Sequence, residues 1–128
     1  EGATKFVTLT VNGAQTEAEA HQVASTIATS LLTKTAIYGR DANWGRVLAA
    51  AGRSGVKFDP RKLALRFGDL PLLKDGTPVP FSEEVALAIL SPDEIEIVLD
   101  LNDGLASATV WTCDLSHEYV NINAAYRT

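Results

Sequence analysis

The residue pattern of β-strands occurs near both ends of the chain. Phe6 to Val11 is rich in β-branched residues and ends at the turn signal Asn12-Gly13. Glu94 to Leu101 places four apolar side chains on one face, at Ile95, Ile97, Leu99 and Leu101. The turn signal Asn102-Asp-Gly104 follows and leads into the strand pattern of Ala106 to Thr112, so the sequence predicts a hairpin between these two strands.

After the first strand, apolar residues recur with the period of an α-helix. Thr16-Glu-Ala-Glu19 is a capping box, in which the threonine and the second glutamate can satisfy each other's free backbone N–H groups. Six apolar residues share one face of the predicted helix: Ala20, Val23, Ala24, Ile27, Ala28 and Leu31. The pattern therefore predicts an amphipathic helix that buries this face.

A second strand and a second helix are expected next. Thr33 to Tyr38 is interpreted as a strand, and a helix opens near Asn43. The buried side of that helix is predicted to carry Trp44, Val47, Leu48 and Ala51. Gly52 or Gly55 supplies its end. The order strand, helix, strand, helix is typical of helices packed on a sheet.

The second half of the chain predicts shorter elements. Leu63 to Phe67 has the pattern of a short strand, and Asp75-Gly76 marks a turn between Pro71 and Pro80. Ser82 caps a short helix whose first turn holds two acids, Glu83 and Glu84. Tyr119 to Thr128 has no clear period. We therefore expect an α/β (α+β) fold, a mixed sheet with packed helices, in which residues 1–128 form a single unit.

Composition restricts the class of protein and its partners. The 128 residues are 46% hydrophobic and 21% charged, which is typical of a globular protein. A net charge of −5 argues against nucleic acid or an anionic membrane as the main partner. The single cysteine, Cys113, favours a reducing compartment. Since the sequence contains no methionine, we expect it to be part of a larger protein.

Motifs for common chemistry do not fit the sequence. Gly39 and Gly45 are separated by five residues where a phosphate-binding loop needs four, and Arg46 stands where that loop has lysine. His21, His117 and Cys113 lack the spacing of metal ligands, so we expect no metal and no cofactor. Neither histidine follows a nucleophile motif. None of these patterns therefore supplies a complete catalytic apparatus by itself.

The segment Tyr38 to Val47 concentrates polar groups beside a tryptophan. Arg40 and Arg46 can form bidentate pairs with carboxylates, and Asp41 is an obvious partner for one of them. Asn43 suits a helix cap, which leaves Trp44 free to pack. Residue chemistry alone leaves two interpretations open, a structural corner or a surface that faces a ligand.

Three stretches together resemble one known family. They are Glu1-Gly-Ala-Thr-Lys5, the long motif from Lys34 to Arg46 (Lys-Thr-Ala-Ile-Tyr-Gly-Arg-Asp-Ala-Asn-Trp-Gly-Arg), and Asn123-Ala-Ala-Tyr-Arg-Thr128. In sequence, order and placement they look like the last third of the ornithine acetyltransferases (glutamate N-acetyltransferases) of arginine biosynthesis. The resemblance covers essentially all 128 residues and implies the C-terminal part of that family's fold.

The resemblance also implies an activity. Enzymes of that family move the acetyl group of N-acetylornithine to glutamate through a ping-pong acyl-enzyme on a threonine. This threonine becomes the amino terminus of a β chain when the precursor cleaves itself. It belongs upstream of Glu1, as does the oxyanion hole, and Thr4 does not occupy its motif. The chain alone is therefore expected to be inactive, and its partners would be the α chain and the rest of the β chain.

The family's substrate-contacting residues match three positions, which are Glu1, Asn123 and Thr128. The family supplies no ligand contact for the segment Arg40 to Arg46, which is then interpreted as a rigid corner near the site. The resemblance implies a cytoplasmic protein in bacteria and a mitochondrial one in fungi, serving arginine synthesis or a secondary-metabolite pathway. The alternative is a non-catalytic amino-acid-binding module or a proteolytic fragment.

Overall fold

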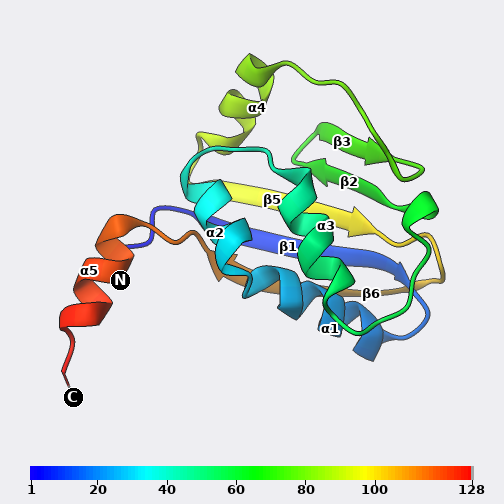
Figure 1. Cartoon of the computed structure of the whole chain (residues 1–128), viewed down its shortest axis with the longest axis horizontal. Helices are drawn as coiled ribbons and strands as arrows, with labels where there is room; N and C mark the ends of the chain where they lie inside the picture. Colours follow the sequence, from blue (N-terminus) through cyan, green and yellow to red (C-terminus); the bar gives the residue numbers. More distant parts are fainter. Residues whose placement is uncertain (128) are drawn as a thin grey trace.

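One mixed β-sheet organises the computed structural model, which describes residues 1–127 (Figure 1). The strand order across the sheet is β4-β3-β2-β5-β1-β6. The strands are β1 (Phe6–Ala14), β2 (Ala64–Phe67), β3 (Leu70–Lys74), β4 (Thr77–Pro78), β5 (Glu94–Asp100) and β6 (Ala106–Cys113). β1, the first strand of the sequence, lies between β5 and β6, which come from the last third of the chain.

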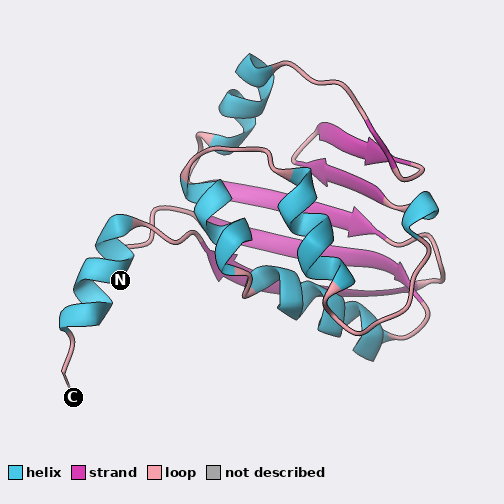
Figure 2. Cartoon of the chain, in the orientation of Figure 1, coloured by secondary structure: helices cyan, strands magenta, loops and turns pink. Residues whose placement is uncertain are grey.

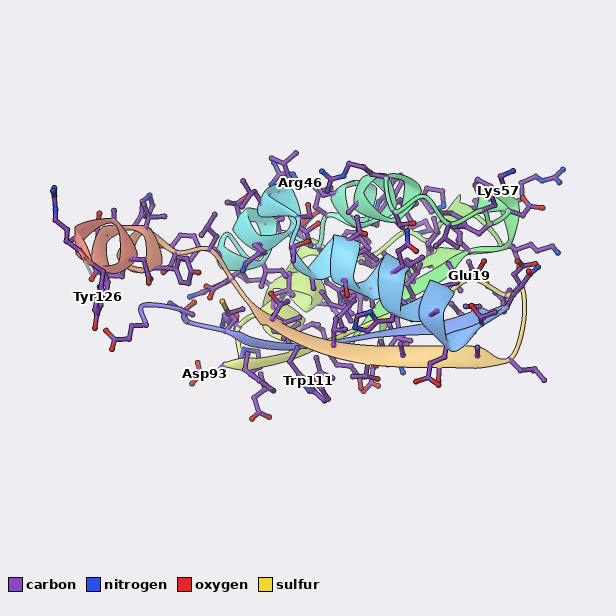
Figure 3. All side chains as sticks on the ribbon, turned by 90° about the horizontal axis from the view of Figure 1, so that it is seen from below. Glu19, Arg46, Lys57, Asp93, Trp111 and Tyr126 are labelled. Carbon is purple, nitrogen blue, oxygen red and sulfur yellow. The ribbon has the colours of Figure 1, made fainter. Side chains whose placement is uncertain are left out.

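The helices cover one face of the sheet or lie at its margin. They are α1 (Glu17–Ala28), α2 (Leu31–Tyr38), α3 (Trp44–Gly52), the 3-10 turn η1 (Pro60–Lys62), α4 (Glu83–Leu90) and α5 (His117–Ala125). Figure 3 shows α1, α2 and α3 on one side of the sheet and Trp111 on the other. Figure 2 shows α5 projecting beyond the sheet, beside the amino terminus. No helix within residues 1–127 is both long enough and apolar enough to cross a membrane.

The first predicted helix is confirmed, with a correction at its end. Thr16 caps α1, and its hydroxyl oxygen accepts a hydrogen bond from the N–H of Glu19 at 3.1 Å. Five of the six predicted face residues are buried in α1: Ala20, Val23, Ala24, Ile27 and Ala28. Leu31 was expected on this face, but it begins α2 and is 67% exposed. The chain turns at Thr29 and Ser30, so Leu31 leaves the helical row.

The strand predicted at Thr33 to Tyr38 is wrong, because this segment is the helix α2. The hydroxyl oxygen of Ser30 accepts from the N–H of Thr33 at 3.2 Å and caps the first turn. Thr33, Ala36 and Ile37 are buried, at the spacing of one helix face. The β-branched residues suggested a strand, but the cap and the burial of one helical face outweigh that weak preference.

The predicted hairpin between β5 and β6 is also wrong, because β1 lies between them. Leu9 of β1 lies opposite Ile97 of the parallel strand β5 and opposite Val110 of the antiparallel strand β6. The connection from β5 to β6 crosses the end of β1, where the N–H of Leu101 donates to the Asn12 carbonyl oxygen at 2.9 Å. Because β1 lies between β5 and β6, both of its edges form backbone hydrogen bonds with a neighbouring strand. If β5 and β6 formed a hairpin, part of the backbone of β1 would lack these partners.

The remaining short elements follow the sequence prediction. Asp75 and Gly76 both have positive φ, 48° and 70°, as the two-residue turn between β3 and β4 requires. Ser82 caps α4, and Asn43 caps α3, which ends at Gly52. On α3, Val47 and Ala51 are buried, whereas Trp44 and Leu48 are partly buried against the core.

The tail contains a helix that the sequence did not predict. Ser116 caps α5 by accepting from the N–H of Tyr119 at 2.9 Å, yet no residue of α5 is buried. An apolar period arises only where a helix buries one face, and the described part of the chain covers no face of α5. This explains why periodicity failed at Tyr119 to Ala125.

The core lies between the sheet and the helices α1 to α4. Its most deeply buried strand residues are Val7, Leu9 and Val11 of β1, Ile97 and Leu99 of β5, and Leu65 and Phe67 of β2. Alternate residues of β1 therefore face the helices, while Phe6 is 52% exposed on the other side.

Replacing Leu9 by alanine tests the central position of β1. Leu9 is 1% exposed, so we expect Leu9→Ala to lower the free energy of unfolding by about 2–5 kcal/mol in urea denaturation. Leu105→Ala is the matched control, because Leu105 is fully exposed and should cost less than about 0.5 kcal/mol. Equal losses for the two variants would contradict this placement.

Candidate functional site

The first and last segments of the described chain meet around Asp114, which follows β6 and is completely buried. Its Oδ1 atom accepts hydrogen bonds from the backbone N–H of Thr4 at 2.8 Å and of Lys5 at 3.0 Å. The hydroxyl group of Thr4 donates to Oδ2. Ser116 adds a contact two residues later, because its hydroxyl group donates to the carbonyl oxygen of Gly2. The segment before β1 is thereby attached to the beginning of α5.

Gly2 allows this close approach. Its φ is +86°, a left-handed conformation that residues with a Cβ atom rarely adopt. A Cβ atom at this position would lie 2.6 Å from the backbone nitrogen of Tyr119, well inside contact distance. Residues 1–4 can therefore rest on the first turn of α5 only with glycine at position 2.

Two of the predicted substrate-contacting residues come together here. The Nδ2 atom of Asn123 donates to the backbone oxygen of Glu1 at 3.4 Å and to the carbonyl oxygen of Tyr119 at 2.8 Å. Both Glu1 and Asn123 are exposed, so their free polar atoms face solvent. Thr128, the third predicted residue, lies outside the described residues. The substrate roles of all three stay predictions.

Polar and aromatic side chains join α2 to the beginning of α5. The Lys34 ammonium nitrogen lies 3.8 Å from the Cys113 sulfur and 5.7 Å from the centre of the Tyr119 ring. The Tyr38 hydroxyl group forms a 3.3 Å hydrogen bond with Nδ1 of His117, and the two rings meet edge to face. A cavity of about 390 Å³ beside them is lined partly by His117 and Val120. Sequence analysis assigned none of these contacts.

Contacts of Asn43 and Arg46 connect the end of the motif at 34–46 to helix α2. Asn43 Oδ1 accepts from the N–H of Arg46 at 3.1 Å, and the Arg46 guanidinium group donates to the carbonyl oxygen of Leu32 at 3.0 Å. Asp41 does not pair with either arginine as expected, because its carboxylate accepts from the side-chain amide of Asn43 at 3.1 Å. These contacts hold α3 against α2.

The end of α2 explains the backbone at Arg40. The N–H of Asp41 donates to the carbonyl oxygen of Ala36 at 2.9 Å, and the N–H of Arg40 donates to the carbonyl oxygen of Ile37 at 3.1 Å. This is the Schellman pattern, with Arg40 at the left-handed position that glycine usually occupies, at φ 55°. The turn directs the chain from α2 toward the cap of α3.

Ionic contacts within residues 1–127 lie away from this region. The ion pairs are Arg61 with Asp59, at 3.0 Å, and Arg66 with Glu96, at 2.8 Å. The side-chain hydrogen bond from Arg61 lowers the pKa of the Asp59 carboxyl group. In the described part of the chain, no group of three or more His, Cys, Asp or Glu residues could hold a metal ion.

The two residues that join the chain ends, Asp114 and Ser116, were not predicted from the sequence. Ser116 had a usable signal, since a serine followed by an acid in the first turn of the helix, here Glu118, is typical of a helix start. Asp114 had none, because its partners Thr4 and Lys5 lie about 110 residues away in the sequence.

Comparison with known proteins identifies the family of this chain. The model of the ArgJ family matches residues 1–128. The chain belongs to the ArgJ family. The arginine biosynthesis bifunctional protein ArgJ of Chlorobaculum tepidum is 55% identical over 128 residues, which is all of this chain and 32% of that protein. A mitochondrial ArgJ of Heterostelium pallidum is 48% identical over 145 residues, covering 33% of its length.

A solved structure extends the comparison to the fold. The crystal structure of ArgJ from Bacillus halodurans superimposes with a TM-score of 0.94 at 44% identity, over 98% of this chain and 60% of that chain. The predicted α/β fold and the family resemblance are therefore confirmed. The chain spans about a third of the length of the curated ArgJ proteins that it matches.

Replacing Gly2 by alanine tests the contact between residues 1–4 and α5. Because the added Cβ atom clashes with Tyr119, we expect the backbone amides of Tyr119 and Val120 to exchange hydrogen roughly tenfold faster, measured by hydrogen exchange. Gly52→Ala is the control, since nothing lies within 4 Å of its added Cβ atom and α5 should be unaffected. Unchanged exchange in Gly2→Ala would contradict this contact.

Proposed function

We propose that this chain forms part of an acetyltransferase of arginine biosynthesis, which transfers the acetyl group of N-acetylornithine to glutamate. Membership of the ArgJ family supports the proposal, as do relatives named for arginine biosynthesis that match the chain over its whole length. On this proposal, residues 1–128 act as one unit of a longer enzyme. The same chemistry could serve primary arginine synthesis or a secondary-metabolite pathway.

The proposed reaction is a ping-pong transfer. The hydroxyl oxygen of a threonine on a preceding segment attacks the acetyl carbonyl carbon of N-acetylornithine. Ornithine leaves with the proton from that hydroxyl group, and the acetyl group stays on the threonine as an ester. The α-amino group of glutamate then attacks the ester and releases N-acetylglutamate. Self-cleavage of the precursor gives the threonine a free α-amino group that serves as the base.

This chain would supply amino-acid recognition through Glu1, Asn123 and Thr128. The observation that carries the proposal is the 3.4 Å contact from the Asn123 amide to the backbone oxygen of Glu1, across 122 sequence positions. This contact places the backbone of Glu1 next to Asn123, and the carboxylate of the one residue with the amide of the other suits a substrate that carries both an ammonium and a carboxylate group. Arg40 to Arg46, including Trp44, would act as a rigid support rather than as ligand contacts.

Exposed apolar residues support the proposed partners, which are the α chain and the rest of the β chain of the same precursor. Trp111 is 63% exposed on the sheet face opposite α1, α2 and α3 (Figure 3). Phe6 is 52% exposed and lies on the same face, because Trp111 is opposite Thr8 and Phe6 is two positions from Thr8 on β1. On α5, Val120 is 50% exposed. Such surfaces favour association, because burial of apolar area is stabilising.

The proposed location follows from the same relatives. Bacterial ArgJ proteins and ArgJ proteins named as mitochondrial both match the whole chain. We place this protein in the cytoplasm if it is bacterial and in the mitochondrion if it is fungal. The proposed mechanism uses no cofactor.

Substitution of Glu1 in the assembled enzyme tests the proposed site. We expect Glu1→Gln to raise the KM for N-acetylornithine about tenfold, because it removes a charged hydrogen-bond acceptor for the substrate. Asn123→Ala should raise it roughly two- to tenfold. Asn121→Ala is the matched control on the same helix, since Asn121 bonds only Glu118 among the described residues. An unchanged KM in both Glu1→Gln and Asn123→Ala would contradict the proposed role of this chain.

A second experiment separates an enzyme portion from a free binding module. We expect this chain, expressed alone, to show no acetyl transfer and to aggregate, because its apolar surfaces lack their partners. Native mass spectrometry of the whole protein should show it in a larger complex with a companion chain that begins with threonine. A stable, monomeric 128-residue chain that binds amino acids would instead favour the non-catalytic module.

A further inference from the structure

The buried carboxylate of Asp114 has no part in the proposed chemistry, yet it contacts the segment that carries Glu1. It is 0% exposed and accepts from three donors, the N–H of Thr4, the N–H of Lys5 and the Thr4 hydroxyl group. Burial of a carboxylate is costly unless such donors surround it. With donors at both oxygens, the orientation of the carboxylate is fixed relative to Thr4.

These donors belong to the residues that immediately follow Glu1. Thr4 is three positions from Glu1, and the carbonyl oxygen of Gly2 accepts from Ser116, two residues after Asp114. The segment from Asp114 to Ser116 therefore holds residues 1–5 at two points, and it leads directly into α5, which carries Asn123. The position of Glu1 relative to Asn123 thus depends on this one segment.

Lys5 supplies a separate attachment that does not involve Asp114. Its side-chain ammonium group donates to the carbonyl oxygens of Ser91, at 2.6 Å, and Pro92, at 2.7 Å. From Phe6 onward, β1 pairs with strands on both sides. Loss of the Asp114 carboxylate should therefore release residues 1–4 while β1 stays in the sheet.

We propose that Asp114 is a positioning residue of the amino-acid site, which acts by holding residues 1–4 so that Glu1 lies beside Asn123. This inference rests on the proposed function of Glu1. Asp114 does not touch substrate and acts only through the segment that it holds. Its effect on substrate affinity should accordingly disappear when Glu1 has already lost its carboxylate.

A double-mutant cycle in the complete, assembled enzyme tests this. With N-acetylornithine as substrate, we expect Asp114→Ala to raise KM about tenfold, with a smaller change in kcat. In the Glu1→Gln background, the same substitution should change KM less than about twofold. Asp103→Ala is the control, because Asp103 lies before β6, at the other end from Asp114, and contacts Gln15. It should leave KM unchanged.

Milder variants keep the test decisive if Asp114→Ala does not fold. Asp114→Asn keeps one oxygen for the two backbone donors, and Thr4→Val removes only the hydroxyl donor. Each should raise KM roughly two- to fivefold in the wild-type background and not in Glu1→Gln. Thr4→Ser, which keeps the hydroxyl group, should restore the wild-type KM.

The outcomes distinguish this inference from the proposed function. Two results would overturn positioning by Asp114 and leave the proposed site standing. In the first, Glu1→Gln raises KM and the Asp114 variants do not. In the second, the Asp114 variants raise KM by the same factor in the Glu1→Gln background as in the wild type. If Glu1→Gln leaves KM unchanged, the proposed role of Glu1 fails, and the positioning role fails with it.

Discussion

The carboxylate of Asp114 is the contact on which the arrangement of the two chain ends depends. Its hydrogen bonds to Thr4 and Lys5 join the segment before β1 to the segment after β6. Because β1 and β6 are antiparallel neighbours, the start of one strand lies beside the end of the other. The buried carboxylate of Asp114 lies at this position and accepts hydrogen bonds from the backbone N–H groups of Thr4 and Lys5. The segment from Asp114 to Ser116 also fixes where α5 begins, and therefore where Asn123 lies.

The sheet makes this meeting possible because β1 lies between β5 and β6. Phe6, at the start of β1, is opposite Cys113, the residue before Asp114. A hairpin of β5 with β6 would have kept these residues apart. The parallel pairing with β5 also buries Leu9 and Ile97 against the helices. Core burial and the assembly of the candidate site therefore require the same strand order.

Helix α5 has a different relation to the rest of the chain. It has nine residues and no buried face, and an isolated helix of that length is marginal in water. Its attachments are the cap at Ser116, the contact of Gly2 with its first turn and the bond of Asn123 to Glu1. Apolar side chains on α5 and on the open sheet face remain exposed within residues 1–127. The ArgJ relatives are about three times longer, which provides further chain to cover these faces.

Local patterns in the sequence determined the amphipathic helix α1, the strands β1, β2, β5 and β6, the Asp75–Gly76 turn and the caps at Thr16, Asn43 and Ser82. Each depends on neighbours within a few residues. The motifs at 1–5, 34–46 and 123–128 also identified the family, and the resemblance predicted substrate contacts at Glu1, Asn123 and Thr128. Only the tertiary structure decided that 31–38 is helical, that β1 separates β5 from β6, and that Asp114 and Ser116 hold residues 2–5. The helix at 31–38 depends on the burial of Thr33, Ala36 and Ile37, which outweighs the local strand preference of its β-branched residues. The strand order and the attachment of residues 2–5 depend on hydrogen bonds between residues about 90 to 115 positions apart, and no local pattern encodes such contacts.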